Sequence, residues 1–321
     1  MSATPQTDIP VRITRVEPIA EGIVLFEMRH RDGSALPAFT AGSHVSVRLP
    51  NGMVRKYALC GDPAEHERYR IAVKREDRGR GGSVYLCDNT REGDEWAISA
   101  PANDFELPQR ADNFIFIAGG IGITPIMAMI HALKSDPAKK FKLFYCARRP
   151  EMAPFREALS APEFRGKVAF HYDNGDPDKA LDLWPIVEER KNRAHIYCCA
   201  PRGLMQAVRD ATGHWSPAAI HFESFTDAQA GRPDDKPFQV KLASTGEIVD
   251  VPAGVTILEA MRASGHTVPS SCESGTCGTC RTGLLEGEAD HRDLVLTDDE
   301  RQSQIMICVS RALTPTITID R

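Results

Sequence analysis

The chain has 321 residues and a formal net charge of −5, with 42% hydrophobic and 26% charged residues. This composition is ordinary for a globular protein and excludes disordered and fibrous classes, and no apolar run reaches the roughly 20 residues that a membrane helix needs. The N-terminus, MSATPQTDIPVRITR, has no apolar segment of a secretory signal, so we expect a cytoplasmic protein. In a reducing compartment, the nine cysteines serve metals or chemistry rather than disulfides.

The net charge lies in the last part of the chain. Residues 231–321 carry 9 basic and 14 acidic side chains, which accounts for the whole −5. This excess argues against nucleic-acid binding, which needs a basic surface. An acidic module can steer a positively charged protein partner, although a merely solvated acidic surface explains the charge equally well. We expect no membrane association and a monomeric chain.

Residues 1–110 are expected to form an antiparallel β-barrel. Short segments that alternate polar and apolar residues are separated by turns rich in Gly and Pro, as in half-buried antiparallel strands. Many such strands in succession favour a barrel or sandwich. The expected strands are VRITRV, GIVLFEM, HVSVRL, RKYALC, RYRIAVK and EWAIS.

Residues 111–228 change to an α/β pattern with a parallel sheet. Apolar runs (FIFIA, FKLFYCA, VAFHYD, HIYCCA) are interspersed with helical segments such as IMAMIHAL and RGLMQAVRDATG. Residues 229–236 belong to a polar stretch with Gly and Pro and are expected to be a linker. Residues 237–321 then form a small α+β module with strands FQVKLAS, EIVDVP and TITID, the helix TILEAMRASG and a cysteine-rich loop.

Four cysteines in this module form the strongest motif of the chain. They are spaced C-x4-C-x2-C with a distant fourth member, which is the plant-type [2Fe–2S] spacing. Gly275 and Gly278 would let backbone N–H groups approach the sulfurs. A structural zinc site usually has two short knuckles, and a redox dithiol would leave two of the four unexplained. The expected metal ligands are Cys272, Cys277, Cys280 and Cys308.

A glycine turn joins the first strand of the α/β part to its helix. In FIFIAGGIGITP, Gly119, Gly120 and Gly122 would allow close approach of a phosphate to the helix N-terminus. Thr124 is expected to cap the helix, and Pro125 fits its first turn. A tight structural turn without a ligand remains the alternative.

The barrel carries a second phosphate-binding pattern. Arg55 and Tyr57 are two residues apart on one strand and therefore face the same side, so the Arg could hold a phosphate while the Tyr stacks on a planar ring. Gly81, Gly82 and Ser83 open an expected helix, SVYLCDN, and could complete the pocket. An ordinary surface Arg and a core Tyr would give the same pattern.

These motifs together resemble the phthalate dioxygenase reductase family over essentially the whole chain. The resemblance rests on RKYALCGDP, the GRGGS loop, GGIGITP, YCCAP, HFESF and SCESGTCGTC, in this order. It implies an FMN-binding barrel, an NADH-binding α/β domain and a β-grasp ferredoxin. It also implies hydride transfer from NADH to FMN, single electrons through [2Fe–2S], and a Rieske-type terminal oxygenase as partner, with no catalytic acid or base.

The resemblance also assigns residues to the two organic cofactors. For FMN it implies Arg55, Lys56, Tyr57, Ala58, Ala72, Val73, Lys74, Arg80, Gly81, Gly82, Ser83, Thr124 and Phe225. For NADH it implies Gly119, Gly120, Thr124, Asp173, Cys199 and Pro201.

Two positions depart from the family pattern. Ala58 stands where the family usually has a Ser whose hydroxyl lies near flavin N5, and Ala200 replaces the Gly of a Cys-Gly-Pro turn. Both departures bear on the rate of hydride transfer. Arg148 and Arg149 follow FKLFYCA, where a basic residue could receive the 2′-phosphate of NADPH.

Two other functions remain open on the sequence. The protein could reduce a soluble ferredoxin or a demethylase or other monooxygenase component instead of a Rieske oxygenase. It could also be an electron carrier or an iron–sulfur sensor without a pyridine nucleotide, but the two glycine loops and the RKY strand argue against that class.

Overall fold

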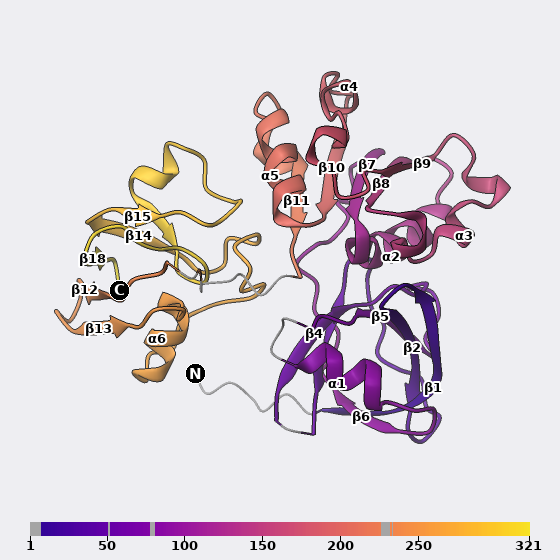
Figure 1. Cartoon of the computed structure of the whole chain (residues 1–321), viewed down its shortest axis with the longest axis horizontal. Coiled ribbons are helices and arrows are strands. Elements are labelled where there is room, and N and C mark those ends of the chain that lie inside the picture. The colour runs from indigo at the N-terminus through magenta and orange to yellow at the C-terminus, as the bar shows by residue number, and fades with distance from the viewer. Residues whose placement is uncertain (1–7, 51, 78–80, 226–231, 233) are drawn as a thin grey trace. The chain divides into compact units, whose positions relative to one another are not determined.

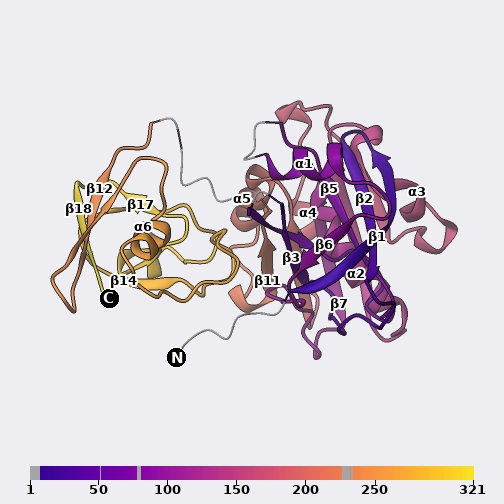
Figure 2. The same cartoon turned by 90° about the horizontal axis from the view of Figure 1, so that it is seen from below.

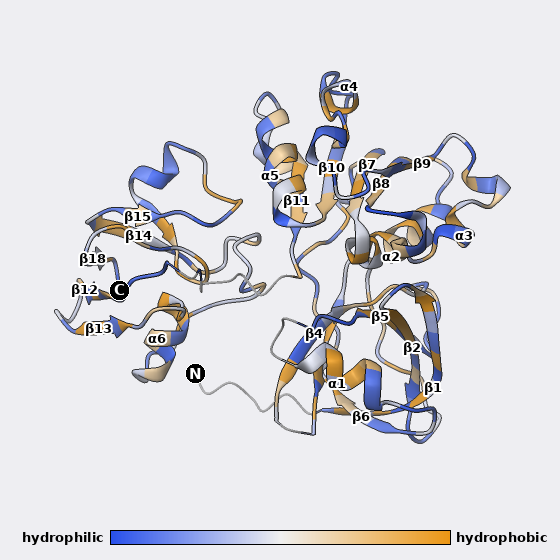
Figure 3. Ribbon diagram, in the orientation of Figure 1, coloured by the Kyte–Doolittle hydropathy of each residue, from blue (hydrophilic) through white to orange (hydrophobic). Residues whose placement is uncertain are grey.

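The computed structural model of the protein describes residues 8–50, 52–77, 81–225, 232 and 234–321. The chain divides into two compact units, of which the first ends at His221 and the second runs from Phe222 to Arg321 (Figure 1). Hydrophobic stretches lie mainly in strands and helices, and many connecting turns are hydrophilic (Figure 3). No helix in the described residues is both long and apolar enough to cross a bilayer.

The first sheet is antiparallel and six-stranded. Its strands are β1 (Ile9–Ala20), β2 (Ile23–His30), β3 (His44–Arg48), β4 (Val54–Ala58), β5 (Tyr69–Lys74) and β6 (Glu95–Ile98). The order β4-β3-β6-β1-β2-β5 leaves β4 and β5 at its two ends. The Cys60 N–H, just after β4, donates to the Arg70 carbonyl of β5 at 2.9 Å. The sheet thereby closes into a barrel, and helix α1 (Gly82–Asn89) packs against β5.

The second sheet has five strands in the order β11-β10-β7-β8-β9 (Figure 1). Figure 2 shows the same chain from below, with β7 and β11 of this sheet labelled. Its strands are β7 (Asn113–Gly119), β8 (Lys140–Ala147), β9 (Val168–Tyr172), β10 (Ala194–Cys199) and β11 (Ile220–Glu223). The pairs β10–β7, β7–β8 and β8–β9 are parallel. From β7 the chain continues to β8 and β9 on one side and then returns to β10 on the other. The carboxyl ends of β7 and β10 therefore border the crevice where open α/β sheets bind ligands.

Short and long helices connect these strands. They are η1 (Gly120–Gly122), α2 (Ile123–Lys134), η2 (Pro150–Met152), α3 (Arg156–Leu159), η3 (Pro162–Phe164), η4 (Pro177–Lys179), α4 (Trp184–Val187), α5 (Arg202–Ala211) and η5 (Pro217–Ala219). The barrel and the parallel sheet share one continuous cluster of buried apolar residues. The boundary expected at residue 110 lies within this unit and stays a prediction.

The second unit is a mixed sheet with one helix. Its strands are β12 (Phe238–Leu242), β13 (Ile248–Val251), β14 (Arg281–Glu286), β15 (Ala289–Asp290), β16 (Gln304–Met306), β17 (Arg311–Ala312) and β18 (Thr316–Ile319), and its helices are α6 (Ile257–Ala263) and η6 (Glu300–Gln302). The order is β13-β12-β18-β14-β16, with β12 parallel to β18, and β15 pairs with β17. A capping box of Thr256 and Glu259 starts α6. The unit has its own buried apolar cluster.

The expected fold class is confirmed, with an antiparallel barrel, a parallel sheet and a small α+β module. Every expected strand and helix named above is present within a few residues of its expected bounds. The strands β11, β14, β15, β16 and β17 were not expected. Their short length and few alternating apolar residues gave no signal.

Candidate cofactor sites

Arg55 and Tyr57 lie on one side of β4, and both are half-buried. The Arg55 Nη1 donates to the Val54 carbonyl at 2.9 Å, and Nη2 lies 3.3 Å from the Met53 sulfur. Lys56 is exposed, and the Ala58 side chain is buried. The arrangement agrees with the expectation that the Arg and the Tyr share a face, and the barrel wall holds both.

The start of α1 adjoins Arg55. Gly81 occupies the N-cap position with φ +81°, and a Cβ on Gly82 would lie 2.9 Å from the Arg55 Nε. A guanidinium therefore lies beside the first amides of a helix, which is a donor set suited to a phosphate. The Ser83 hydroxyl accepts from the Glu76 N–H at 3.0 Å and keeps its own proton to donate. Arg80 lies outside the described residues.

The other barrel residues of the expected flavin site lie on β5. The side chains of Ala72 and Val73 are buried in the core, so their main-chain groups are the ones that could meet a ligand. Lys74 is exposed, and its Nζ lies 3.2 Å from the Glu76 carboxylate. β5 also packs against η1, which brings the barrel strand beside the glycine turn of the parallel sheet.

The glycine turn at the end of β7 packs tightly on the turn at the end of β10. A Cβ on Gly119 would lie 2.5 Å from Pro201 Cδ and 2.9 Å from Ala200 Cβ. A Cβ on Gly122 would lie 2.0 Å from the Cys199 carbonyl oxygen. Three of the positions expected to bind NADH are thus brought together by contact between two loops, namely Gly119, Cys199 and Pro201. The methyl group of Ala200 lies in that contact.

The expectation that Thr124 caps α2 is wrong. Gly122 occupies the N-cap position, and Thr124 lies within the first turn, where it is buried. Its hydroxyl donates to the Ile121 carbonyl at 3.0 Å. The η1 turn runs directly into α2, so the N-cap position lies two residues before Thr124. Pro125 lies in the first turn, as expected.

Asp173 follows β9, and its loop is joined to the end of β8. One carboxylate oxygen accepts from the Gly175 N–H at 2.7 Å, and the Arg148 carbonyl accepts from the Asn174 N–H at 2.9 Å. Asp173 and Arg148 are thereby held at the carboxyl edge of the sheet. Phe225 is partly exposed and lies beyond the first unit, so its contact with a flavin stays a prediction.

The four cysteines of the second unit form two interacting pairs, Cys272 with Cys277 and Cys280 with Cys308. The Cys272 sulfur accepts from the Ser274 N–H at 3.4 Å and the Thr276 N–H at 3.5 Å. The hydrogen bond from Cys277, helped by these amides, lowers the pKa of Cys272 to about 4. The bond from Cys308 likewise lowers the pKa of Cys280.

This donor set fits an iron–sulfur cluster, because such a cluster is held by four cysteine sulfurs and backbone N–H groups donate to two of these sulfurs, those of Cys272 and Cys277. Gly275 adopts φ +73°, and a Cβ there would lie 2.7 Å from Val309 and 3.2 Å from the Asp293 Cα. Asp293 was missed by sequence reasoning. Its buried carboxylate accepts from the Val295 and Leu296 amides, and its neighbour Leu294 donates to the Gly275 carbonyl. Within the described residues, no three His, Cys, Asp or Glu side chains are grouped around a point that one metal ion could occupy.

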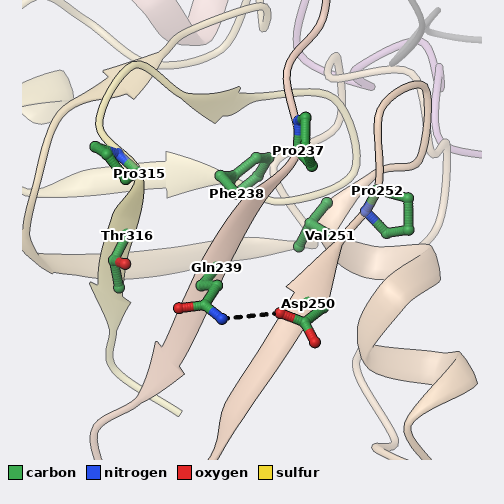
Figure 4. A pocket seen from close by; sticks show the side chains of 8 residues that line it. All are labelled: Pro237, Phe238, Gln239, Asp250, Val251, Pro252, Pro315 and Thr316. Atoms are coloured by element: carbon green, nitrogen blue, oxygen red, sulfur yellow. Dashed lines mark hydrogen bonds between the residues drawn. The ribbon is translucent and has the colours of Figure 1, made fainter.

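A hollow of about 480 Å³ lies elsewhere on the second unit, over β12, β13 and β18 (Figure 4). Gln239 and Asp250 meet at its edge through a 3.0 Å hydrogen bond. None of the four cysteines lines it, so it is not part of the cluster site.

Comparison with known proteins agrees with these sites. Residues 116–210 match the oxidoreductase NAD-binding domain, and residues 240–313 match the 2Fe-2S iron-sulfur cluster binding domain. The chain is 48% identical to the phthalate 4,5-dioxygenase oxygenase reductase subunit of Pseudomonas putida, over 100% of both chains. It is 47% identical to the phthalate dioxygenase reductase of Burkholderia cepacia, over 99% of both.

A solved structure of a phthalate dioxygenase reductase, described as a modular structure for electron transfer from pyridine nucleotides to [2Fe–2S], shares the architecture. It superposes with a TM-score of 0.75 at 46% identity, over 98% of both chains. The chain therefore belongs to the phthalate dioxygenase reductase family and is an NADH-dependent iron–sulfur flavoprotein reductase with FMN and a [2Fe–2S] cluster.

Proposed function

We propose that the protein takes electrons in pairs from NADH and delivers them singly to the terminal component of a Rieske-type aromatic oxygenase. The observation that carries the path from NADH to the flavin is the contact of η1 with β5. The 47% identity to a phthalate dioxygenase reductase over 99% of both chains supports an oxygenase component as the electron acceptor. A nucleotide bound in the crevice of the parallel sheet would thereby have its nicotinamide end next to the strand expected to hold the flavin. When bound, FMN supplies the exchange between a hydride donor and a one-electron acceptor, and the [2Fe–2S] cluster supplies that acceptor.

The barrel residues would hold FMN by its two ends. The Arg55 guanidinium would bind the phosphate together with the first amides of α1, whose helix end favours an anion. Tyr57 would stack on the isoalloxazine ring, and main-chain groups of Ala72 and Val73 would border it. The closed barrel orients these groups before the cofactor binds.

The crevice residues would hold NADH. The Gly119–Gly122 turn and the first amides of α2 would receive the pyrophosphate, and the turn from Cys199 to Pro201 would border the nicotinamide. Tyr145 stabilises the Gly119–Gly122 turn, because its hydroxyl donates to the Gly120 carbonyl at 3.1 Å. Asp173 would accept a hydrogen bond from a ribose hydroxyl.

The cluster ligands would be Cys272, Cys277, Cys280 and Cys308. Their arrangement in two pairs suits two irons, each of which would take two thiolates. All nine cysteines are described, and none of them forms a disulfide. We propose a cytoplasmic, reducing location on this ground. We also propose that the chain is a monomer.

Two measurements test the proposed cofactor sites: the identity of the bound flavin and the iron content of cysteine variants. The heat-released flavin of the purified protein should co-elute with FMN, and the release of FAD would contradict the proposed phosphate pocket. Cys272→Ser should lose most of the iron, whereas Cys87→Ser should keep it, because the Cys87 thiol lies against the Val73 carbonyl of the barrel. Full iron content in the Cys272→Ser protein would remove Cys272 from the proposed ligand set.

The salt dependence tests the proposed partner. If the acidic second unit steers docking, electron transfer to the oxygenase should slow as salt rises, because the screening length falls from about 10 Å at 0.1 M to about 3 Å at 1 M. Reduction of the flavin by NADH, measured by stopped flow, should change much less. An oxygenase reaction that is indifferent to salt would contradict electrostatic steering.

A further inference from the structure

A buried carboxylate lies beside the loop that carries three of the four expected cluster ligands. The Asp293 side chain is 0% exposed, and its Oδ2 accepts from the Val295 N–H at 3.0 Å and from the Leu296 N–H at 2.7 Å. Burial disfavours a charged carboxylate, but the neighbouring His291 ring and these amides outweigh burial and lower the pKa of Asp293. The side chain therefore carries a negative charge at neutral pH.

Gly275 connects this carboxylate to the cluster ligands. The Gly275 carbonyl accepts from the Leu294 N–H at 3.0 Å, and a Cβ on Gly275 would lie 3.2 Å from the Asp293 Cα. The Gly275 N–H in turn lies against the Cys308 sulfur. A single residue of the cysteine loop therefore separates Asp293 from a ligand sulfur, and charges on buried groups so close together are only weakly screened.

We propose that the buried charge of Asp293 lowers the reduction potential of the [2Fe–2S] cluster and so favours the passing of each electron to the protein partner. One electron taken from the flavin adds one negative charge at the cluster, with no bond made or broken and no proton transferred. A fixed negative charge nearby raises the free energy of this more negative reduced state above that of the oxidised state. The inference rests on the proposed cluster ligands.

A redox titration of the full-length protein tests the proposal, with the reduced cluster followed by electron paramagnetic resonance. Asp293→Asn removes the charge but keeps an oxygen that can accept from the two amides. The variant should favour the reduced cluster about three- to tenfold more than the wild-type protein does, which corresponds to a potential about 30–60 mV higher for one electron. The g-values should stay the same, because the four sulfur ligands are unchanged.

Arg301→Gln and Asp250→Asn complete the test. The Arg301 Nη2 donates to the Asp293 carbonyl at 3.3 Å, so a positive charge lies at the same turn and its removal should lower the potential. Asp250 is the matched control, because it is an exposed carboxylate of β13 at the hollow that none of the four cysteines lines. Asp250→Asn should leave the potential of the cluster unchanged.

The outcomes separate the charge of Asp293 from other causes. An unchanged potential in Asp293→Asn, with the cluster retained, would overturn the proposal. An equal rise in Asp250→Asn would overturn it as well, because the net charge of the unit would then explain the shift. If Asp293→Asn fails to hold iron, Arg301→Gln decides, and the lack of a downward shift there would overturn the proposal. If the reduced wild-type protein shows no cluster signal, the proposed ligands fail too.

Discussion

Ala58 is the residue at which this chain departs from its family pattern in the expected flavin site. It ends β4, its side chain is 3% exposed, and its backbone pairs with His44 of β3. An alanine has no group that can donate a hydrogen bond to a ring atom. A hydrogen bond to that point of the flavin ring must therefore come from the main chain or from another side chain.

Ala58→Ser should raise the rate at which NADH reduces the flavin. A hydroxyl that bonds more strongly in the transition state contributes about 0.5–1.5 kcal/mol, which corresponds to about a three- to tenfold faster step. Stopped-flow absorbance at the flavin band measures this rate directly. An unchanged or slower rate would show that a backbone N–H already serves this purpose.

Residues differ in how far the sequence alone could assign them. The spacing of Cys272, Cys277, Cys280 and Cys308 predicted one joint site, and the structure brings the four into two interacting pairs. Thr124 was misassigned because its position in the first turn depends on the η1 turn before it. The ion pair between Arg149 and Glu21 gave no signal in the sequence, because the two residues lie 128 positions apart.

At the scale of elements, the crevice of the parallel sheet depends on two loops in close contact. Local patterns predicted β7, β10 and the glycine turn, because buried strands and glycines leave a strong sequence signal. They could not show that Gly122 faces the Cys199 carbonyl, which is a tertiary contact. β14 was missed for a related reason, since Gly283 and exposed Leu285 break its alternation and its pairing with β16 and β18 supplies the stability.

Gly122→Ala should destabilise the first unit. The new methyl group would lie 2.0 Å from the Cys199 carbonyl oxygen, and backbone must move to admit it, at a cost of about 2–3 kcal/mol. Gly203→Ala is the control, because a Cβ there meets nothing within 4 Å and alanine favours the helix α5. Urea unfolding should show a lower free energy of unfolding for Gly122→Ala and an unchanged one for Gly203→Ala. Equal stability of the two variants would contradict the close contact of the two loops.

The pairing of β10 with β11 makes stability depend on pH through His221. Burial and, to a smaller extent, the adjacent His195 together lower the pKa of His221 to about 4. The ring stacks on Tyr197 with centroids 4.3 Å apart, and its Nε2 lies 2.9 Å from the His195 Nδ1. Folding therefore favours the neutral imidazole, and the unfolded chain takes up a proton near pH 6.5.

The stabilisation of the folded state by neutral His221 is fully present above about pH 6.5 and is lost as the pH falls toward 4. From pH 7 to pH 5, His221 should account for a loss of about 1–2 kcal/mol in the free energy of unfolding. His221→Phe keeps an aromatic ring against Tyr197 but cannot take up this proton. Between pH 7 and pH 5 its free energy of unfolding should therefore fall by about 1–2 kcal/mol less than that of the wild-type protein. Parallel pH profiles of the two proteins would contradict the assignment.

The whole molecule combines two units with separate apolar cores. One buried cluster extends through the barrel and the parallel sheet, and a second lies in the unit that carries the cysteines. The proposed flavin and nucleotide sites draw on the first unit, with Phe225 as the exception, and the proposed cluster ligands lie in the second. Oxidation of NADH and delivery of electrons to a protein partner should therefore be separable by cutting the chain between them.

A chain that ends after Phe225 should remain folded, because it retains the complete first apolar cluster. It should keep FMN and still oxidise NADH with ferricyanide, a small acceptor that does not need the cysteines. It should fail to reduce the oxygenase component, because the one-electron relay of Cys272, Cys277, Cys280 and Cys308 is gone. The full-length Cys272→Ser protein serves as the control that lacks the cluster but not the second unit, and it should fail in the same way. If the iron-free truncated chain still drives the oxygenase at the full rate, the cluster is not on the electron path and the proposed function is wrong.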